Sequence, residues 1–205
     1  FIANYPDNSE NKISLNENKL TDCINNFIQQ FSISTIQQLP IITNGLFGYM
    51  TYDVVQYFED ITLDKPTPEI PIVQYHCYQY IIAFNHFNHE LFIVKNNVDG
   101  CENDPTTLEE IESIIKFKPL QLDNFSSDAE KTSNLTDVEY LGMVNKGKQS
   151  CYRGDVFQIV LSRQFQQKYR GDDFNVYRAL RSVNPSPYCF YFDFDGFRLM
   201  GSSPE

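Results

Sequence analysis

The stretch Gly154–Phe165, with the sequence GDVFQIVLSRQF, is the part of the chain around which the rest is arranged. Read with the two-residue period of a β-strand, it has two distinct faces. One face carries Phe157, Ile159, Leu161 and Phe165, with Arg163 as the exception. The other carries Val156, Gln158, Val160, Ser162 and Gln164. The first face suits a core, and the amide and hydroxyl groups of the second suit a pocket floor as well as a sheet interior. The stretch therefore predicts a central strand.

The residues that follow predict a helix and a hairpin. Asp172 or Asp173 is expected to cap a helix with Phe174, Tyr177 and Leu180 on one face, which ends at the prolines of Asn184–Pro187. The hairpin is predicted over Tyr188–Phe194 and Phe197–Gly201, with Asp195-Gly196 as a type I′ turn. This register places Asp193 opposite Arg198 and predicts an ion pair worth about 0.2–1 kcal/mol.

The residues before the central stretch predict a second helix and a domain boundary. Thr136 and Glu139 form the capping-box pattern T-x-x-E, so a helix is expected from there to about Tyr152, with Gly154 as a left-handed final residue. The segment Lys118–Ser133 loses hydrophobic periodicity and gains Ser, Asp and Asn. It is interpreted as a linker, so we expect domains over residues 1–118 and 135–205 joined by residues 119–134.

The first domain is predicted to contain both helices and strands. Its expected elements are a helix over Leu20–Phe31, a strand over Gly45–Tyr52, a short helix over Tyr52–Glu59, a hairpin of Tyr78–Phe84 with Glu90–Lys95, and a helix over Leu108–Phe117. Lys65–Pro71 reads as a proline-rich loop. His86 and His89 fall in the hairpin loop and are interpreted as exposed rather than metal-binding, because no third ligand accompanies them. The fold class is therefore α+β.

Composition limits the kinds of partner. The 205 residues are 41% hydrophobic and include 17 Phe and 13 Tyr, and the net charge of −11 argues against nucleic acid and anionic membranes. The five cysteines are scattered without a CxxC pair, which indicates reduced thiols in a cytosolic protein. Cys151 and Cys189 are interpreted as small buried hydrophobic residues. No apolar run approaches the length of a membrane span.

Three segments in order, GDVFQIVLSRQF, RALRSVNPSPYCFYFDF and GSSPE, resemble the chorismate-utilising enzyme family, and within it the anthranilate synthase component I family. A fourth, GLFGYMTYDVVQYFED at Gly45–Asp60, resembles the amino-terminal domain of the same enzymes. The resemblance implies a two-domain α+β fold with mixed or antiparallel sheets and packed helices. Residues 1–118 would form the amino-terminal domain, and residues 135–205 the first part of the chorismate-binding domain. It also implies that the chain is truncated, with less than half of the family's usual length.

The resemblance implies an activity and partners. The parent protein is expected to add ammonia to chorismate and eliminate pyruvate, giving anthranilate for tryptophan biosynthesis. It is expected to use Mg²⁺, with ligands beyond Glu205, and to receive ammonia from a glutamine amidotransferase subunit. The 205 residues alone are expected to be inactive. Aminodeoxychorismate synthase component I and a non-catalytic module that binds the amidotransferase or tryptophan remain as alternatives.

The resemblance also assigns roles to particular residues. Family members that add water to chorismate carry a lysine base at the position of Gln158; because a glutamine amide is not a base, Gln158 favours ammonia as the nucleophile. Glu205 matches the general acid that protonates the departing C4 hydroxyl. Asn184, Pro187, Tyr188 and Cys189 match a segment of the tryptophan feedback site, in which methionine is usual at the position of Cys189. The serine-containing motif that forms the other half of that site is not found in this chain.

Overall fold

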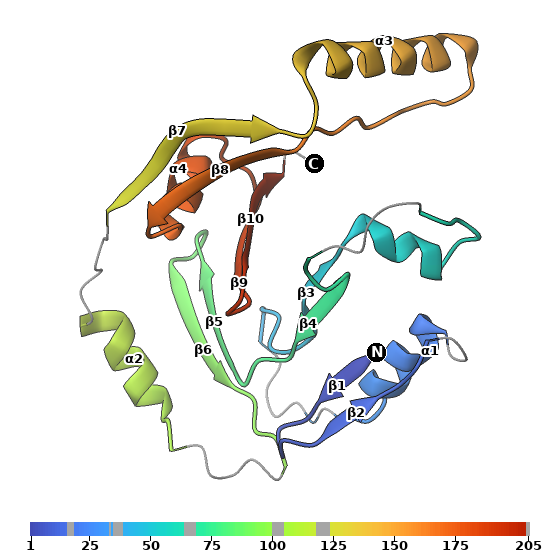
Figure 1. The fold of residues 1–205 in the computed structure, drawn as a ribbon. Helices are drawn as coiled ribbons and strands as arrows, with labels where there is room; N and C mark the ends of the chain where they lie inside the picture. Colours follow the sequence, from blue (N-terminus) through green and yellow to red (C-terminus); the bar gives the residue numbers. More distant parts are fainter. Residues whose placement is uncertain are drawn as a thin grey trace. The chain divides into compact units, whose positions relative to one another are not determined.

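The computed structural model describes residues 1–15, 19–32, 34, 39–63, 69–99, 105–117 and 124–203. The chain divides into two compact units, Phe1–Pro119 and Leu120–Glu205. Within the described ranges, the strands form antiparallel two-stranded pairs and alternate with helices (Figure 1). The fold is therefore α+β, as predicted. The assignment of the two units to particular domains of the family stays a prediction.

Among its described residues, the first unit contains three strand pairs and two α-helices. Its elements are β1 (Ile2–Asn4), β2 (Glu10–Lys12), α1 (Leu20–Ile28), β3 (Phe47–Met50), the 3₁₀ helix η1 (Tyr52–Tyr57), β4 (Val73–His76), β5 (Tyr80–Asn85), β6 (Glu90–Lys95) and α2 (Leu108–Phe117). Gly48 in β3 lies so close to β4 that an added Cβ would overlap the backbone carbonyl of Gln74. This close approach explains the glycine in the predicted strand.

Most predictions for the first unit are confirmed. The helix bounds of α2 agree with the prediction, the β5–β6 hairpin forms, and His86 and His89 are exposed in its loop. The helix α1 ends three residues earlier than expected. Residues 65–68 of the proline-rich loop lie outside the described ranges.

The part of the second unit that the structure describes contains two strand pairs and two helices. Its elements are β7 (Phe125–Ser133), α3 (Asp137–Arg153), β8 (Phe165–Gly171), α4 (Phe174–Val183), β9 (Tyr188–Asp193) and β10 (Arg198–Ser203). β7 pairs with β8, and β9 pairs with β10. The predicted linker is therefore wrong over Phe125–Ser133, because these residues form a strand. Every residue of β7 is exposed, so its sequence does not show the alternation of apolar and polar residues that would predict a strand.

The predicted central strand does not form over residues 156–164, and β8 begins only at Phe165. The stretch instead runs in an extended conformation beside α3 (Figure 1). A Cβ added to Gly147 of α3 would lie 3.4 Å from side-chain carbons of Ile159 and Leu161, so the apolar face meets a helix rather than a sheet. A strand also needs a neighbouring strand for its hydrogen bonds, and none lies beside this stretch in the described residues.

Residues 135–163 form an excursion from the β7–β8 pair that we call the arm. The chain leaves the pair at Asn134 and returns at Gln164, and two hydrogen bonds join these residues. Gln164 N donates to Asn134 Oδ1 at 3.0 Å, and Asn134 N donates to Gln164 O at 3.3 Å. Arg163 closes the arm by donating from Nη1 to Asp137 Oδ1 at 2.6 Å and from Nε to Ser133 Oγ at 2.8 Å. These contacts explain why the charged residue Arg163 is present on the otherwise apolar face of the stretch Gly154–Phe165.

The β9–β10 register is as predicted, but the turn type is not. Asp193 lies opposite Arg198, and their carboxylate and Nε atoms are 3.2 Å apart. Asp195 has a positive φ of 66°, whereas Gly196 is not among the positive-φ glycines, so the turn is not type I′. Gly196 N instead donates to Phe194 O at 2.8 Å, a tighter closure around Asp195.

Candidate functional site

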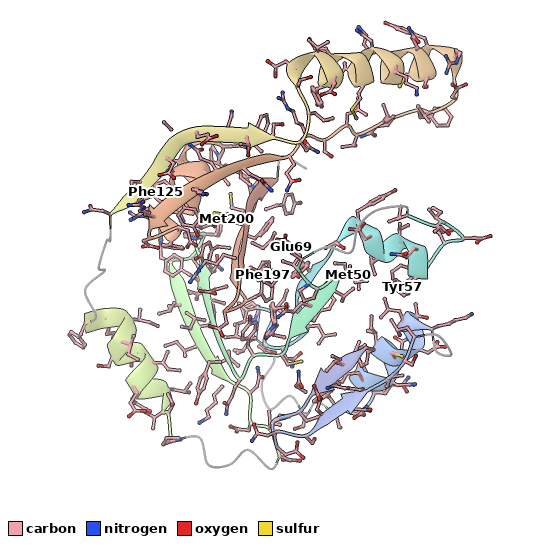
Figure 2. The ribbon with its side chains drawn as sticks, in the orientation of Figure 1. Met50, Tyr57, Glu69, Phe125, Phe197 and Met200 are labelled. Carbon is pink, nitrogen blue, oxygen red and sulfur yellow. The ribbon has the colours of Figure 1, made fainter. Side chains whose placement is uncertain are left out.

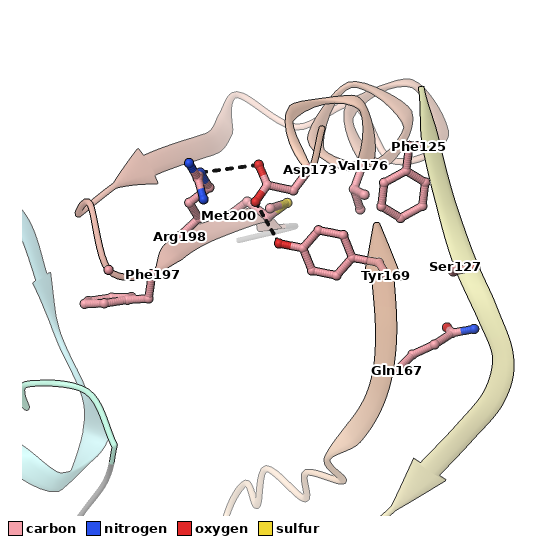
Figure 3. A pocket seen from close by; sticks show the side chains of 10 residues that line it. Phe125, Ser127, Gln167, Tyr169, Asp173, Val176, Phe197, Arg198 and Met200 are labelled. Carbon is pink, nitrogen blue, oxygen red and sulfur yellow. Dashed lines mark hydrogen bonds and ion pairs between the residues drawn. The ribbon is translucent and has the colours of Figure 1, made fainter. Parts of the chain in front are cut away.

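The second unit holds a buried carboxylate, Asp173, at the point where β8 leads into α4. Asp173 is 8% exposed, and among the described residues it is the only charged residue that is buried. Tyr191 of β9 donates its hydroxyl to Oδ1 at 2.9 Å, and Tyr169 of β8 donates to Oδ2 at 2.9 Å. Arg198 Nε of β10 lies 3.4 Å from Oδ1. One carboxylate therefore ties together strands from both pairs of the unit (Figure 3).

A cavity of about 350 Å³ borders this cluster. Its walls combine aromatic and aliphatic side chains with a few polar groups, from Phe125, Ser127, Gln167, Tyr169, Asp173, Val176, Gly196, Phe197, Arg198 and Met200. The rings of Phe125 and Tyr169 stack with their centroids 5.6 Å apart. Figure 2 shows Phe125 on β7, Phe197 in the hairpin turn and Met200 on β10 as parts of this unit.

The electrostatics of the cluster favour the neutral form of its two tyrosines. Burial and the hydrogen bond to Asp173 raise the pKa of Tyr191 to about 12, and the hydrogen bond to Asp173 raises the pKa of Tyr169. Asp173 and Asp193 in turn raise the pKa of Arg198. Each polar group of the cluster already has partners, so the cluster is suited to joining the strands and the helix.

Sequence reasoning found Asp173 only as a candidate helix cap. In the structure Asp173 is the N-cap residue of α4 but makes no side-chain cap hydrogen bond, and Asp172 Oδ1 accepts from Phe174 N at 2.9 Å instead. The pair Asp172-Asp173 was the available signal. A helix cap needs only one carboxylate, so the second aspartate indicates another role. The tyrosine partners lie on other strands and gave no local signal.

The predicted feedback segment is partly brought together by Ser202 of β10. In the strand register Ser202 lies opposite Cys189, and Cys189 Sγ lies 3.4 Å from Ser202 Oγ. Ser202 Oγ also donates to the backbone oxygen of Asn184, and Asn184 Nδ2 donates to Ser202 O at 3.4 Å. Pro187 and Tyr188 are exposed. The structure therefore links Asn184 with Cys189 and leaves the other two members at the surface.

The two predicted catalytic residues are not brought together in the described structure. Gln158 is exposed on the extended part of the arm, and its amide has no hydrogen-bond partner among the described residues. Glu205 lies outside the described residues. The prediction that Cys151 and Cys189 are buried is wrong, because Cys151 is exposed and Cys189 is half-buried. Within the described ranges, no helix has the length and apolar character needed to cross a membrane.

Comparisons with known proteins match nearly the whole chain. The family described as chorismate binding enzyme matches residues 3–205. Anthranilate synthase component 1 of Aquifex aeolicus is 31% identical over 190 residues, which cover 82% of this chain and 36% of the relative. The chloroplastic anthranilate synthase alpha subunit 1 of Arabidopsis thaliana is 33% identical over 194 residues, covering 83% of this chain and 32% of the relative. The chain thus spans only about a third of the length of these curated relatives.

A solved structure supports the fold. Anthranilate synthase component I from Streptococcus pneumoniae TIGR4 superposes with a TM-score of 0.68 over 98% of this chain and 46% of that chain. The sequence identity is 23%, so this likeness concerns the fold.

Proposed function

Because the chain belongs to the chorismate binding enzyme family, we propose that it is part of an anthranilate synthase component I. That protein would convert chorismate and ammonia to anthranilate and pyruvate in tryptophan biosynthesis. The observation that carries the proposal is the family match over residues 3–205, together with relatives that carry the name anthranilate synthase component 1. The scattered cysteines support a cytoplasmic location.

Gln158 favours ammonia over water as the nucleophile. A neutral amide cannot remove a proton from water to activate it, whereas ammonia is a strong enough nucleophile to attack without a base. A glutamine amidotransferase subunit would release this ammonia from glutamine. We propose Glu205 as the acid that protonates the departing hydroxyl at C4 of chorismate.

Magnesium is part of the proposal, but the described residues do not form a site for it. Within them, no three His, Cys, Asp or Glu side chains gather closely enough to hold a metal ion. Asp173, the buried carboxylate, is already bonded to two tyrosines and an arginine. Any ligands for Mg²⁺ would therefore come from outside the described residues.

The test is to follow the products formed from chorismate, Mg²⁺ and ammonium. The chain is assayed alone and together with the polypeptide that completes the length of a family member. We expect equal amounts of anthranilate and pyruvate from the completed protein and none from the chain alone. Aminodeoxychorismate without pyruvate would instead assign the protein to aminodeoxychorismate synthase, and isochorismate would show that water is the nucleophile.

The nucleophile can be tested at Gln158. Gln158→Lys supplies a base that can activate water, so we expect isochorismate to appear at the expense of anthranilate in the completed protein. Gln158→Asn keeps an amide and is the matched control. Unchanged products in Gln158→Lys would mean that the side chain does not lie near the nucleophile.

We further propose that Asn184, Pro187, Tyr188 and Cys189 belong to a tryptophan feedback site of the completed protein. Binding is measured by isothermal titration calorimetry of tryptophan into the completed protein. We expect a binding signal that Tyr188→Ala removes. An equal response in Tyr188→Ala would reject the assignment of Tyr188.

A further inference from the structure

The helix α4 is joined to the β9–β10 hairpin at both of its ends. At the N-cap, the Asp173 carboxylate accepts the Tyr191 hydroxyl of β9 at 2.9 Å, and Arg198 Nε of β10 lies 3.4 Å from it. At the C-cap, Asn184 Nδ2 donates to Ser202 O at 3.4 Å, and the backbone oxygen of Asn184 accepts the Ser202 hydroxyl. The helix is therefore held against the hairpin at two separate points.

The strand β10 has the side chains and the length to reach both ends of α4. Successive side chains of a strand alternate between two faces, so Arg198, Met200 and Ser202 share one face of β10. The strand spans about 13 Å from Arg198 to Ser202, and the helix spans about 16 Å from cap to cap. Because these lengths are similar, the two polar residues of this face each meet one cap of the helix.

The same face of the hairpin carries Cys189. In the strand register Cys189 lies opposite Ser202, and Tyr191 follows two residues later on the same face of β9. The Tyr191 ring also packs on α4, with its centroid 5.1 Å from that of Phe174 and 5.6 Å from that of Tyr177. Tyr191 therefore connects α4 to the beginning of β9, where Cys189 lies.

We infer that Asp173 is a positioning residue for residues 184–189: by holding Tyr191, it keeps this segment in its arrangement beside the end of α4 and so sets the affinity for tryptophan. Asp173 is buried and both its oxygens have partners, so it acts through the hairpin and not on the ligand. Hydrogen bonds are directional, so the carboxylate fixes the orientation of the hairpin more narrowly than apolar packing would. The effect on tryptophan rests on the proposed function, whereas the hold on the hairpin does not.

A matched pair of substitutions separates positioning from general stabilisation. Tyr191→Phe removes the hydrogen bond between Asp173 and the hairpin but keeps the ring that packs on α4. Tyr169→Phe is the control, because its hydroxyl bonds to the same carboxylate at the same distance of 2.9 Å but comes from β8 (Figure 3). If Asp173 only stabilised the unit as a whole, the two substitutions would have similar effects.

Hydrogen exchange is measured first, on the 205-residue chain, because it does not depend on any ligand. The loss of one hydrogen bond changes an opening equilibrium about 5-fold. We expect Tyr191→Phe to accelerate exchange of the β9 and β10 amides about 5-fold relative to the β7 and β8 amides. Tyr169→Phe should not accelerate exchange in the hairpin relative to those strands.

Tryptophan binding is measured next, by isothermal titration calorimetry with the completed protein. Tyr191→Phe should raise the Kd of tryptophan about 5-fold, whereas Tyr169→Phe should leave it unchanged. Asp173→Asn should also weaken binding. Combining it with Tyr191→Phe should weaken binding by less than the product of the two single effects, because the carboxylate acts through the Tyr191 hydroxyl.

Two results would overturn the inference. The first is equal acceleration of hairpin exchange by the two tyrosine substitutions, which would make Asp173 a general stabiliser of the unit. The second is an unchanged Kd of tryptophan in Tyr191→Phe although hairpin exchange is accelerated. If the unmodified completed protein does not bind tryptophan while exchange changes as expected, the proposed feedback site is rejected, and the role of Asp173 in positioning the hairpin is confirmed.

Discussion

The Asp173 carboxylate shows how a buried charge is accommodated in this chain. Its two oxygens accept hydrogen bonds from Tyr169 and Tyr191, and Arg198 supplies a positive charge. A buried carboxylate without such partners would be strongly destabilising. Its donors come from β8, β9 and β10, so the burial of Asp173 depends on all three strands being in place.

Because of Tyr191, the stability of the second unit is expected to decrease at alkaline pH. Its pKa is raised from 10.0 to about 12 in the folded protein, first by burial and then by Asp173. The unfolded chain loses this proton at lower pH, so the contribution to stability is present below about pH 10 and is lost as the pH rises towards about 12.

Urea unfolding measured across this pH range should therefore show a falling free energy of unfolding, and Tyr191→Phe should reduce the fall. Tyr152 is 84% exposed, so Tyr152→Phe is the control. An identical pH dependence in Tyr191→Phe and the unmodified chain would contradict the prediction.

Ser202 provides a second test at the level of a single residue. Its hydroxyl donates to the backbone oxygen of Asn184 and contacts the Cys189 sulfur, so it fixes the turn before β9 to β10. Ser202→Ala should lower the free energy of unfolding by about 1 kcal/mol, because a hydrogen bond is lost. Ser126→Ala, in the exposed strand β7, should change it little. Equal effects of the two substitutions on the urea midpoint would argue against this role for Ser202.

Two of the helices, α2 and α3, begin at capping boxes that their sequences contain. At α3 the Thr136 hydroxyl accepts from Glu139 N at 3.3 Å, and the Glu139 carboxylate accepts from Thr136 N at 2.8 Å. Thr107 and Glu110 make the same reciprocal bonds at α2, at 3.2 and 2.8 Å. The second T-x-x-E pattern was present in the sequence but was not recognised, although the bounds of α2 were predicted from its apolar spacing.

Removing the α3 cap should destabilise the arm. Thr136→Ala removes the side-chain acceptor and should cost about 1 kcal/mol, measured as helix content against urea concentration by circular dichroism. The bonds to Thr136 lower the pKa of Glu139, so its contribution is present at neutral pH and is lost as the pH falls through that lowered pKa. Thr132→Ala in β7 is the control. If Thr136→Ala leaves the helix content of the chain unchanged, the box does not stabilise α3.

The predictions that were wrong concern strand pairing between segments that are distant in the sequence. β7 consists of exposed residues and forms because β8 pairs with it, whereas residues 156–163 have a strand pattern and remain unpaired. The turn at Asp195-Gly196 shows a smaller difference, since the register was correct while the backbone closed more tightly. Pairing therefore depends on which segments are available, in addition to the residues of the strand itself.

The described part of the chain exposes many large apolar side chains, among them Tyr52, Phe87 and Phe117, which are 75%, 93% and 78% exposed. In the described residues no large side chain is fully buried. The buried apolar residues are few and come from both units: Ala3, Leu20, Cys23, Tyr49, Val54 and Phe194.

This surface predicts weakly cooperative unfolding. The slope of the free energy of unfolding against urea concentration grows with the surface that unfolding exposes. We expect the 205-residue chain to have a smaller slope than a compact protein of equal length, and to bind a dye for exposed apolar surface before urea is added. A steep single transition without dye binding would contradict this expectation. The compact, monomeric control should be a protein of the same length measured under the same conditions.

The sequence by itself determined the α+β class, the helices α1 to α4 and the two hairpins β5–β6 and β9–β10, because their hydrogen bonds and caps join residues close together in the chain. It also carried the motifs that led to the family. Only the tertiary structure decided the burial of Asp173, the link between Asn184 and Cys189 through Ser202, and the pairing of β7 with β8 across the arm. It also left residues 156–163 unpaired. These features need partners that lie far away in the sequence, and local patterns of residues do not specify which distant segments meet.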